Sequence, residues 1–416
     1  MGMLATDWDR VHPRAAHSIE ETGLPFGLIL DLILKHAYFE GTVLLRTLMD
    51  RTKLSPMIIH SLYRHLQKEQ LCETRNMVGE DYEITLSAKG RLMAEVALKR
   101  SQYAGPAPVR LTDYQRVISQ QGISFHIDAD DLRTVLSDLV LPDYVIHQLG
   151  TALVTGGAIL LYGETGNGKT SISERLHKIF NDYVYIPHAV EISGHVLSVF
   201  DTQVHRPHEN QATVADARWM LCRRPMVKVG GELTFEMLEP RVDEVTRIGI
   251  APLQMKANNG ILLIDDFGRQ RIAPRELLNR WIVPLDRRVD LMSIAGMSFE
   301  IPFEVLVLFA TNLKVSDLAE DAFLRRLKNK IKIESLSEDL FKELIRRACQ
   351  HKGLPLTPEI EDYFLEQCSK YSKGQLRACY PTDIAAIVSG MATFERRGSR
   401  MDREDVDSAL GAYFAH

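Results

Sequence analysis

Eight consecutive residues near the middle of the chain have the types and spacing of a phosphate-binding loop. The segment "GETGNGKT" (163–170) fits the pattern GxxxxGK[ST] in full. Glycines let such a loop curl so that its backbone N–H groups point inward at phosphate oxygens. Lys169 is expected to reach the β- and γ-phosphates of ATP, and the Thr170 hydroxyl is expected to bind Mg²⁺. The predicted nucleotide-binding residues are Gly163, Glu164, Thr165, Gly166, Asn167, Gly168, Lys169, Thr170 and Ser171.

The segments on either side of this loop agree with that interpretation. "AILLYG" (158–163) has the composition of a buried strand, and "TSISERLHKIF" (170–180) that of a helix. A helix that begins near Lys169 directs the positive end of its dipole at the bound anion. The alternative is an ordinary glycine-rich turn between a strand and a helix, and this context makes it the weaker interpretation.

A second group of chemically useful residues follows another apolar run. "GILLIDDFG" (260–268) reads as a buried parallel strand that ends in two acids. Asp265 is expected to hold Mg²⁺ through water, and Asp266 to polarise the attacking water. A strand end with capping acids is the alternative, but the phosphate-binding loop earlier in the chain favours the functional interpretation.

With these two motifs in place, the chain resembles an AAA+ ATPase over roughly residues 120–416. "VLVLFATN" (305–312) ends in Asn312 at the family's sensor-1 position, which orients the lytic water. "EDAFLRRLKNKIKI" (320–333) matches the segment that carries arginine fingers, with Arg325 and Arg326 at the matching positions. The resemblance implies that these two guanidinium groups act on the ATP of a neighbouring subunit in a ring, where they stabilise transition-state charge.

Two positions depart from the family pattern. The second acid of the Asp-Glu pair is Asp266, one methylene shorter, which raises the possibility of slow hydrolysis. In "LRACYPTDIAAIV" (376–388) Thr382 follows the proline where the family often has an arginine. Arg377 is the candidate to replace that arginine as a nucleotide-binding residue.

These motifs predict an α/β fold: a P-loop AAA+ core with a parallel sheet and a helical lid, after a small winged helix-turn-helix domain. The expected divisions are 20–100 for the winged-helix-like domain, 101–119 for a linker, 120–334 for the nucleotide-binding domain and 335–416 for the lid. The linker prediction rests on "YAGPAPVRL" (103–111), which has two prolines and a glycine.

The N-terminal segment is predicted to hold three helices followed by a two-stranded wing. Its third helix, "SPMIIHSLYRHLQKEQL" (55–71), would present His60, Arg64 and Lys68 on one side. Residues 25–100 contain 11 Lys/Arg and 9 Asp/Glu, and the wing tip carries Glu80 and Asp81. A DNA-binding domain usually has a clearer basic surface, so a protein-docking module is favoured and nucleic-acid binding is the alternative.

Two candidate hairpins lie within the core segment. The first is "MVKVGGELTFEML" (226–238), with alternating residues around a Gly-Gly pair, and ordinary edge strands are its alternative. The second, in "RRVDLMSIAGMSFEIPF" (287–303), is similar to the pre-sensor-1 hairpin of the AAA+ branch with MoxR-type, RuvB-type and NtrC-type proteins. The MoxR-type pattern is the most similar.

Composition limits the remaining possibilities. The chain has 416 residues and a net charge of −5, and its five scattered cysteines lack CxxC spacing. No secretory signal or membrane-spanning run is visible, so a cytoplasmic protein without membrane insertion is expected. The resemblance implies an ATP- and Mg²⁺-dependent homo-oligomer, a hexameric ring that remodels a protein client. A DNA-associated motor and a slowly hydrolysing nucleotide switch are the alternatives.

Overall fold

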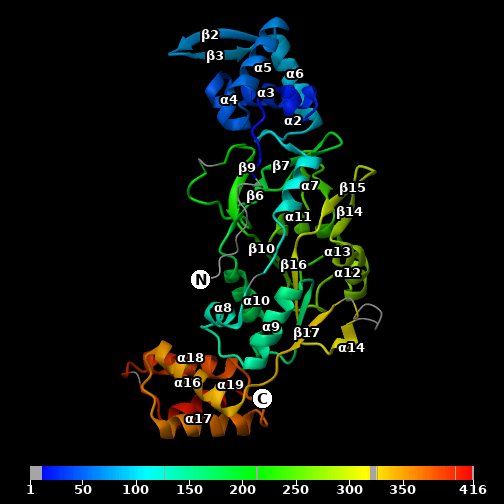
Figure 1. Ribbon diagram of the computed structural model, residues 1–416. Coiled ribbons are helices and arrows are strands. Elements are labelled where there is room, and N and C mark those ends of the chain that lie inside the picture. The colour runs from blue at the N-terminus through cyan, green and yellow to red at the C-terminus, as the bar shows by residue number, and fades with distance from the viewer. Residues whose placement is uncertain are drawn as a thin grey trace.

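The computed structural model describes residues 12–125, 127–211, 214–318, 325, 327–398 and 400–414. Figure 1 shows an elongated molecule with a small N-terminal module at one end, a helical bundle at the other and β-sheets between them. Buried apolar side chains form one core in the N-terminal module, three in the middle part and one in the bundle.

The N-terminal module packs its helices on a three-stranded antiparallel sheet of order β1-β3-β2. Helix α5 buries Ile58, Leu62 and Leu66, which recur at helical spacing, in the core of this module. The predicted order of three helices and a hairpin is observed. The elements are α2 (Ile19–Thr22), α3 (Phe26–Glu40), β1 (Thr42–Leu44), α4 (Leu45–Thr52), α5 (Pro56–Lys68), β2 (Cys72–Val78), β3 (Asp81–Leu86) and α6 (Ala88–Arg100).

The segment 101–119, predicted as a linker, contains regular structure in its second half. Strand β4 (Val109–Arg110) pairs with a strand of the middle part, and helix α7 (Leu111–Gln120) buries Tyr114 and Val117 there. The prolines and glycine of 103–108 do mark a connection. The predicted linker is too long because the prediction followed the turn residues of the connection. The buried apolar side chains of α7, which come after them, place this helix in the middle part.

The sheet that positions the phosphate-binding loop and the two acids after it is parallel throughout and has the strand order β10-β13-β16-β5-β17. Its three inner strands are short runs of largely buried apolar residues, as expected for a sheet covered on both faces, whereas each of the two edge strands also carries exposed lysine. Because all five strands run the same way, their carboxyl ends meet at one edge. The strands are β5 (Ile159–Tyr162), β10 (Met226–Val229), β13 (Ile261–Ile264), β16 (Leu306–Thr311) and β17 (Asn329–Lys332).

Helices cover this sheet on both faces, so the predicted α/β fold class with a parallel sheet is confirmed. Alternate strand residues enter different cores: Leu161 packs with α8, α9 and α10, and Leu160 packs with α12 and Trp281. The helices of this part are α8 (Ala129–Val135), α9 (Asp143–Thr155), α10 (Lys169–Leu176), α11 (Leu253–Ala257), α12 (Pro274–Arg280), α13 (Ile282–Arg287) and α14 (Val315–Leu318), with 3₁₀ turns at His177–Ile179 and Phe235–Leu238.

A second, mixed sheet of order β11-β12-β8-β7-β4 lies between the parallel sheet and the N-terminal module. It packs with helix α7 and with the antiparallel pairs β6–β9 and β14–β15 around a shared core. The remaining strands are β6 (Tyr183–Pro187), β7 (Ala189–Ile192), β8 (His195–Ser198), β9 (Trp219–Arg223), β11 (Arg241–Val242), β12 (Gly249–Ile250), β14 (Val289–Ile294) and β15 (Met297–Pro302).

The two hairpin predictions have opposite outcomes. Strands β14 and β15 pair antiparallel around Ala295-Gly296, so the second hairpin is confirmed. The first prediction is wrong, because residues 226–229 form β10, which pairs in parallel with β13, and residues 235–238 form a 3₁₀ turn. Alternating Val227 and Val229 fit either arrangement, and pairing with a distant strand decides between them.

The C-terminal bundle contains the helices α16 (Glu338–Lys352), α17 (Pro358–Tyr371), α18 (Cys379–Phe394) and α19 (Arg403–Tyr413) around a core of their own. All five cysteines of the chain are free thiols. Among the described residues, no helix has the length and apolar character needed to cross a membrane.

A buried ion pair joins four segments of the middle part. The Arg224 guanidinium donates to both carboxylate oxygens of Asp182 at 2.7 Å and to the backbone carbonyls of Gln121 and Asn259 at 3.0 and 2.9 Å. Both side chains of the pair are only 4% exposed. The pair therefore holds the end of α7, the start of β6, the connection between β9 and β10 and the loop before β13 in one arrangement.

We expect Arg224→Met to lower the free energy of unfolding by about 3–5 kcal/mol, because it leaves the Asp182 carboxylate buried without its charge partner. Chemical denaturation of the full chain measures this loss. The control is Arg346→Met in the bundle, which removes a bidentate pair with Glu361 but from a side chain that is 53% exposed, and should cost much less than Arg224→Met. Equal small losses in the two variants would contradict the structural role of Arg224.

Candidate functional site

The loop between β5 and α10 lies at the carboxyl edge of the parallel sheet. Three of its glycines have positive φ, of 143° at Gly163, 88° at Gly166 and 85° at Gly168. At Gly166 a Cβ atom would lie 2.6 Å from the Cys379 sulfur of the bundle, so both the backbone conformation and the space require glycine there. Helix α10 begins at Lys169, as predicted, which places its N-terminus at the end of the loop.

Lys169 is buried and lies inside the curve of the loop. Its Nζ donates to the backbone carbonyls of Gly163 and Glu164, both at 2.8 Å. An ammonium group has three donors, so these two bonds leave one for a ligand. Burial lowers the pKa of Lys169, while nearby carboxylates, of which Asp266 contributes most, oppose that shift. An anion bound at this loop would compensate the desolvation of the charged lysine.

The first turn of α10 is joined to the end of β13. The Thr170 hydroxyl donates to Asp265 Oδ1 at 2.9 Å, and the Asp266 backbone N–H donates to the same oxygen at 3.1 Å. Asp266 is exposed and has a φ of 48°, a left-handed conformation that aspartate tolerates better than most residues. Of the two acids, Asp265 is therefore the one that is hydrogen-bonded to the helix after the phosphate-binding loop.

These residues line one cavity of about 480 Å³. Asn312, which follows β16, donates from Nδ2 to the Thr165 hydroxyl at 3.1 Å, and its buried Oδ1 has no partner among the described residues. The cavity is within the size range of small-molecule sites. Of the residues predicted from the sequence, it is lined by Thr165, Gly166, Asn167, Gly168, Lys169, Thr170, Ser171, Asp265, Asp266 and Asn312.

The opposite wall of the cavity comes from the helical bundle. Cys379, Thr382 and Asp383 line it, and the Cys379 backbone N–H donates to the Gly166 carbonyl at 3.0 Å. Arg377 does not line this cavity; its guanidinium lies 3.1 Å from Glu164 Oε2. The structure thus brings the start of α18 against the loop and pairs Arg377 with a loop carboxylate outside the cavity.

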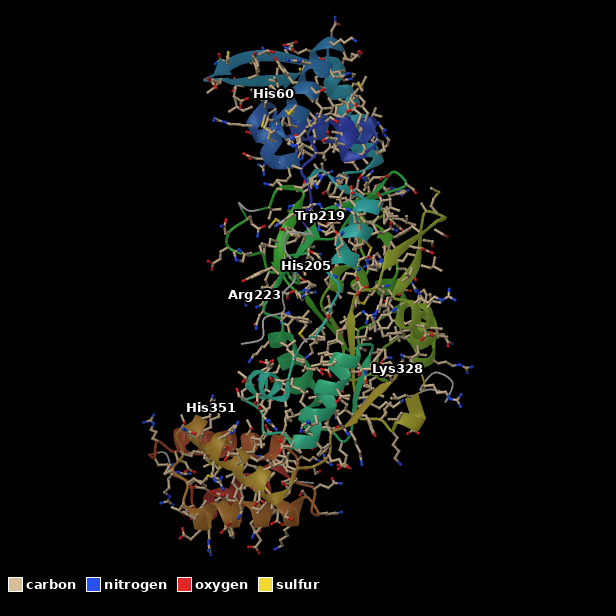
Figure 2. All side chains as sticks on the ribbon, viewed as in Figure 1. His60, His205, Trp219, Arg223, Lys328 and His351 are labelled. Atoms are coloured by element: carbon tan, nitrogen blue, oxygen red, sulfur yellow. The ribbon has the colours of Figure 1, made fainter. Side chains whose placement is uncertain are left out.

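The two arginines predicted to act on a neighbouring subunit lie away from this chain's cavity or outside the described residues. Arg325 is exposed, in a turn between α14 and β17, and is not among the cavity-lining residues; Arg326 lies outside the described residues. Figure 2 shows Lys328, which follows in the same segment, on the side of the core away from His351 of the bundle.

The oxygen atoms at the site suit Mg²⁺ better than a softer metal. Thr170 and Asp265 supply a hydroxyl and a carboxylate that already touch, and Mg²⁺ takes one or two protein oxygens together with water and phosphate oxygens. No group of three or more His, Cys, Asp or Glu side chains that could hold a metal occurs in the described part of the chain. The residues present would fit a magnesium ion whose remaining ligands are water and the phosphate oxygens of a nucleotide.

Several residues of the site carry no motif that a single sequence reveals. The loop 138–141 before α9 contributes Leu139, Val140 and Leu141 to the cavity, and α16 contributes Leu344. Lys228 lies 3.3 Å from Asp265 Oδ2, although its segment was predicted as a hairpin. An apolar run or a strand lysine is common in any α/β protein, so only the folded structure identifies these contributions.

We expect Gly166→Ala to weaken binding of a fluorescent ATP analogue by about tenfold more than Gly168→Ala, because overpacking against Cys379 is added to the left-handed strain. Gly168 has a similar φ but no atom within 4 Å of a Cβ position, which makes it the matched control. The double variant Gly166→Ala/Cys379→Ala should regain part of the affinity. If removing the Cys379 sulfur gives no recovery, the close approach of the bundle does not matter for binding.

The comparisons with known proteins find matches of low similarity. A family described as a domain of unknown function (DUF8689) matches residues 337–412, within the bundle. No curated protein sequence matches the chain. Among solved structures, the chain is similar to NtrX from Brucella abortus in complex with ADP, with 13% identity over 78% of this chain and 60% of that chain and a TM-score of 0.40. It is also similar to the Thermotoga maritima RuvB Holliday junction branch migration motor, with 16% identity over 67% and 71% of the two chains and a TM-score of 0.41. The chain spans about three fifths of the NtrX chain that it matches.

Proposed function

We propose that the protein is an AAA+ ATPase that binds ATP with Mg²⁺ in the cavity between the phosphate loop and the helical bundle. One observation carries the proposal: Lys169, Thr170, Asp265, Asp266 and Asn312, which come from three different strand ends, line a single cavity. A glycine-rich turn of purely structural use would not require the acids of β13 and the amide of Asn312 to converge on it. The apolar residues at 139–141 and Leu344 offer a surface for the base.

Each side chain has a role that follows from its position. Lys169 binds phosphate oxygens with its remaining donor, and the N-terminus of α10 favours the same negative charge. Thr170 and Asp265 would hold Mg²⁺, which supplies charge neutralisation at the phosphates when it is bound. Asp266 accepts a proton from, or orients, the attacking water, and Asn312 positions that water with the oxygen that has no protein partner.

The active site is proposed to be shared between subunits of a ring, which we take to be hexameric. Arg325 is exposed and does not line the cavity of its own chain, as expected of a residue that completes a neighbour's site. Together with Arg326 it would stabilise the charge that develops at the γ-phosphate. The work of the ring is proposed to be remodelling of a protein partner, with the N-terminal module, proposed to be a winged helix, as the docking part.

The N-terminal module also favours a second candidate, a DNA-associated motor. His60, Arg64 and Lys68 are exposed along α5, and His60 is seen on this module in Figure 2. The tip of the β2–β3 hairpin argues for protein docking, because it exposes Met77 and Val78 beside Glu80 instead of basic residues. Stimulation of ATP hydrolysis by duplex DNA, and its dependence on salt, discriminates between the two candidates.

We expect Lys169→Ala to abolish ATP binding, because the loop loses both its point charge and the two bonds that hold its curve. Isothermal titration calorimetry measures the affinity directly. Lys89→Ala, which removes an exposed lysine of the N-terminal module, is the control and should bind as the unaltered chain does. Unchanged binding by Lys169→Ala would refute the assignment of the phosphate loop.

The variant Arg325→Ala/Arg326→Ala should bind ATP nearly normally but hydrolyse it about 10³-fold more slowly, the scale of a lost arginine finger. Steady-state phosphate release measures hydrolysis. Mixing this variant with Lys169→Ala tests sharing, because some mixed interfaces combine an intact loop with intact arginines. No recovery at any mixing ratio would argue against a site shared between subunits.

A further inference from the structure

A lysine outside every motif contacts the carboxylate at the centre of the site. Lys228 lies on β10, directly beside Leu263 of β13 in the parallel register, and Asp265 follows two residues after Leu263. The Lys228 Nζ lies 2.8 Å from Glu174 Oε1 and 3.3 Å from Asp265 Oδ2. Glu174 is on α10, one helical turn after Thr170. Lys228 therefore connects the two elements that Thr170 and Asp265 also connect.

The two oxygens of Asp265 have different partners as a result. Oδ1 accepts from the Thr170 hydroxyl and the Asp266 N–H, whereas Oδ2 faces the Lys228 ammonium. The Asp265 side chain is 16% exposed, so few other orientations are open to it. The carboxylate is thus held from both sides.

A cation beside a metal-binding carboxylate has two opposed effects. It orients the carboxylate, and it reduces the negative charge that attracts a divalent ion. The negative charge of Glu174 offsets the positive charge of Lys228. The two side chains can therefore orient Asp265 while the net charge around it changes little. If both charged residues act on this carboxylate, neutralising one should raise the Mg²⁺ affinity and neutralising the other should lower it. A pair with only a structural role should not produce such opposite shifts.

We propose that Lys228 is a positioning residue for Asp265 and that the pair Lys228–Glu174 sets the Mg²⁺ affinity of the nucleotide site. This inference rests on the proposed function, since it requires Mg²⁺ to bind at Thr170 and Asp265. It assigns a role to β10, the edge strand of the parallel sheet, which contributes no residue to the sequence motifs.

The test is a titration of fluorescent ATP analogue binding with Mg²⁺ in the full chain. Lys228→Met should lower the half-saturating Mg²⁺ concentration by about 3- to 10-fold, the size of one charge removed near the protein surface. Glu174→Gln should raise it by a similar factor. Lys228→Arg, which keeps the charge, should stay close to the unaltered chain. Lys330→Met, on the opposite edge strand β17, is the matched control and should show no shift.

The same variants separate orientation from charge. The kcat of Lys228→Met should fall about tenfold or more even at saturating Mg²⁺, because a carboxylate released on one side loses its position. Thermal unfolding without nucleotide identifies a variant that does not fold, and Lys228→Gln then replaces it. Shifts of the same sign in Lys228→Met and Glu174→Gln, or no shift in either, would overturn the inference. If the unaltered chain shows no Mg²⁺-dependent nucleotide binding, the proposed function itself fails.

Discussion

The hydrogen bond from the Thr170 hydroxyl to the Asp265 carboxylate is the contact on which the site depends. It exists only because β5 and β13 run parallel, with β16 between them, and end at the same edge of the sheet. Reversing one strand, or shifting it by one residue, would send its terminal polar residue to another edge or face. The alternating burial of the strands in two cores fixes that register. Apolar packing thus sets the position of each polar group to within a hydrogen-bond length.

Much of this arrangement could be predicted from local sequence. Short apolar runs that end in polar residues predict β5, β13 and β16, and glycine spacing predicts the loop, because each signal is contained in a few neighbouring residues. The β10 strand could not be recognised, since Val227 and Val229 are compatible with a hairpin or with a sheet edge, and the choice depends on Ile261–Ile264 far along the chain. The sequence placed the segment 376–388 near the nucleotide, but it did not show that Cys379 and Asp383 would line the cavity in place of Arg377, because that depends on how α18 packs against the loop.

The two departures from the family pattern acquire physical explanations in the structure. Asp266 has a left-handed backbone conformation, which the short side chain of aspartate tolerates better than the longer one of glutamate. The backbone conformation at this position therefore favours aspartate over glutamate. Arg377 is paired with Glu164, a loop residue whose side chain the nucleotide motif leaves unspecified. The bundle consequently meets the loop through an ion pair and a backbone hydrogen bond. The residues near the start of α18 that line the cavity are Cys379, Thr382 and Asp383, with no arginine among them.

The contact between Gly166 and Cys379 couples two parts of the chain that otherwise have separate cores. Thermodynamic linkage is reciprocal: if a bound nucleotide favours one angle between the bundle and the loop, then holding that angle strengthens nucleotide binding by the same factor. A force that changes the angle of the bundle would thus change the affinity of the loop for nucleotide. Gly166, which helps to give the loop its shape, would therefore also link the movement of the bundle to nucleotide binding.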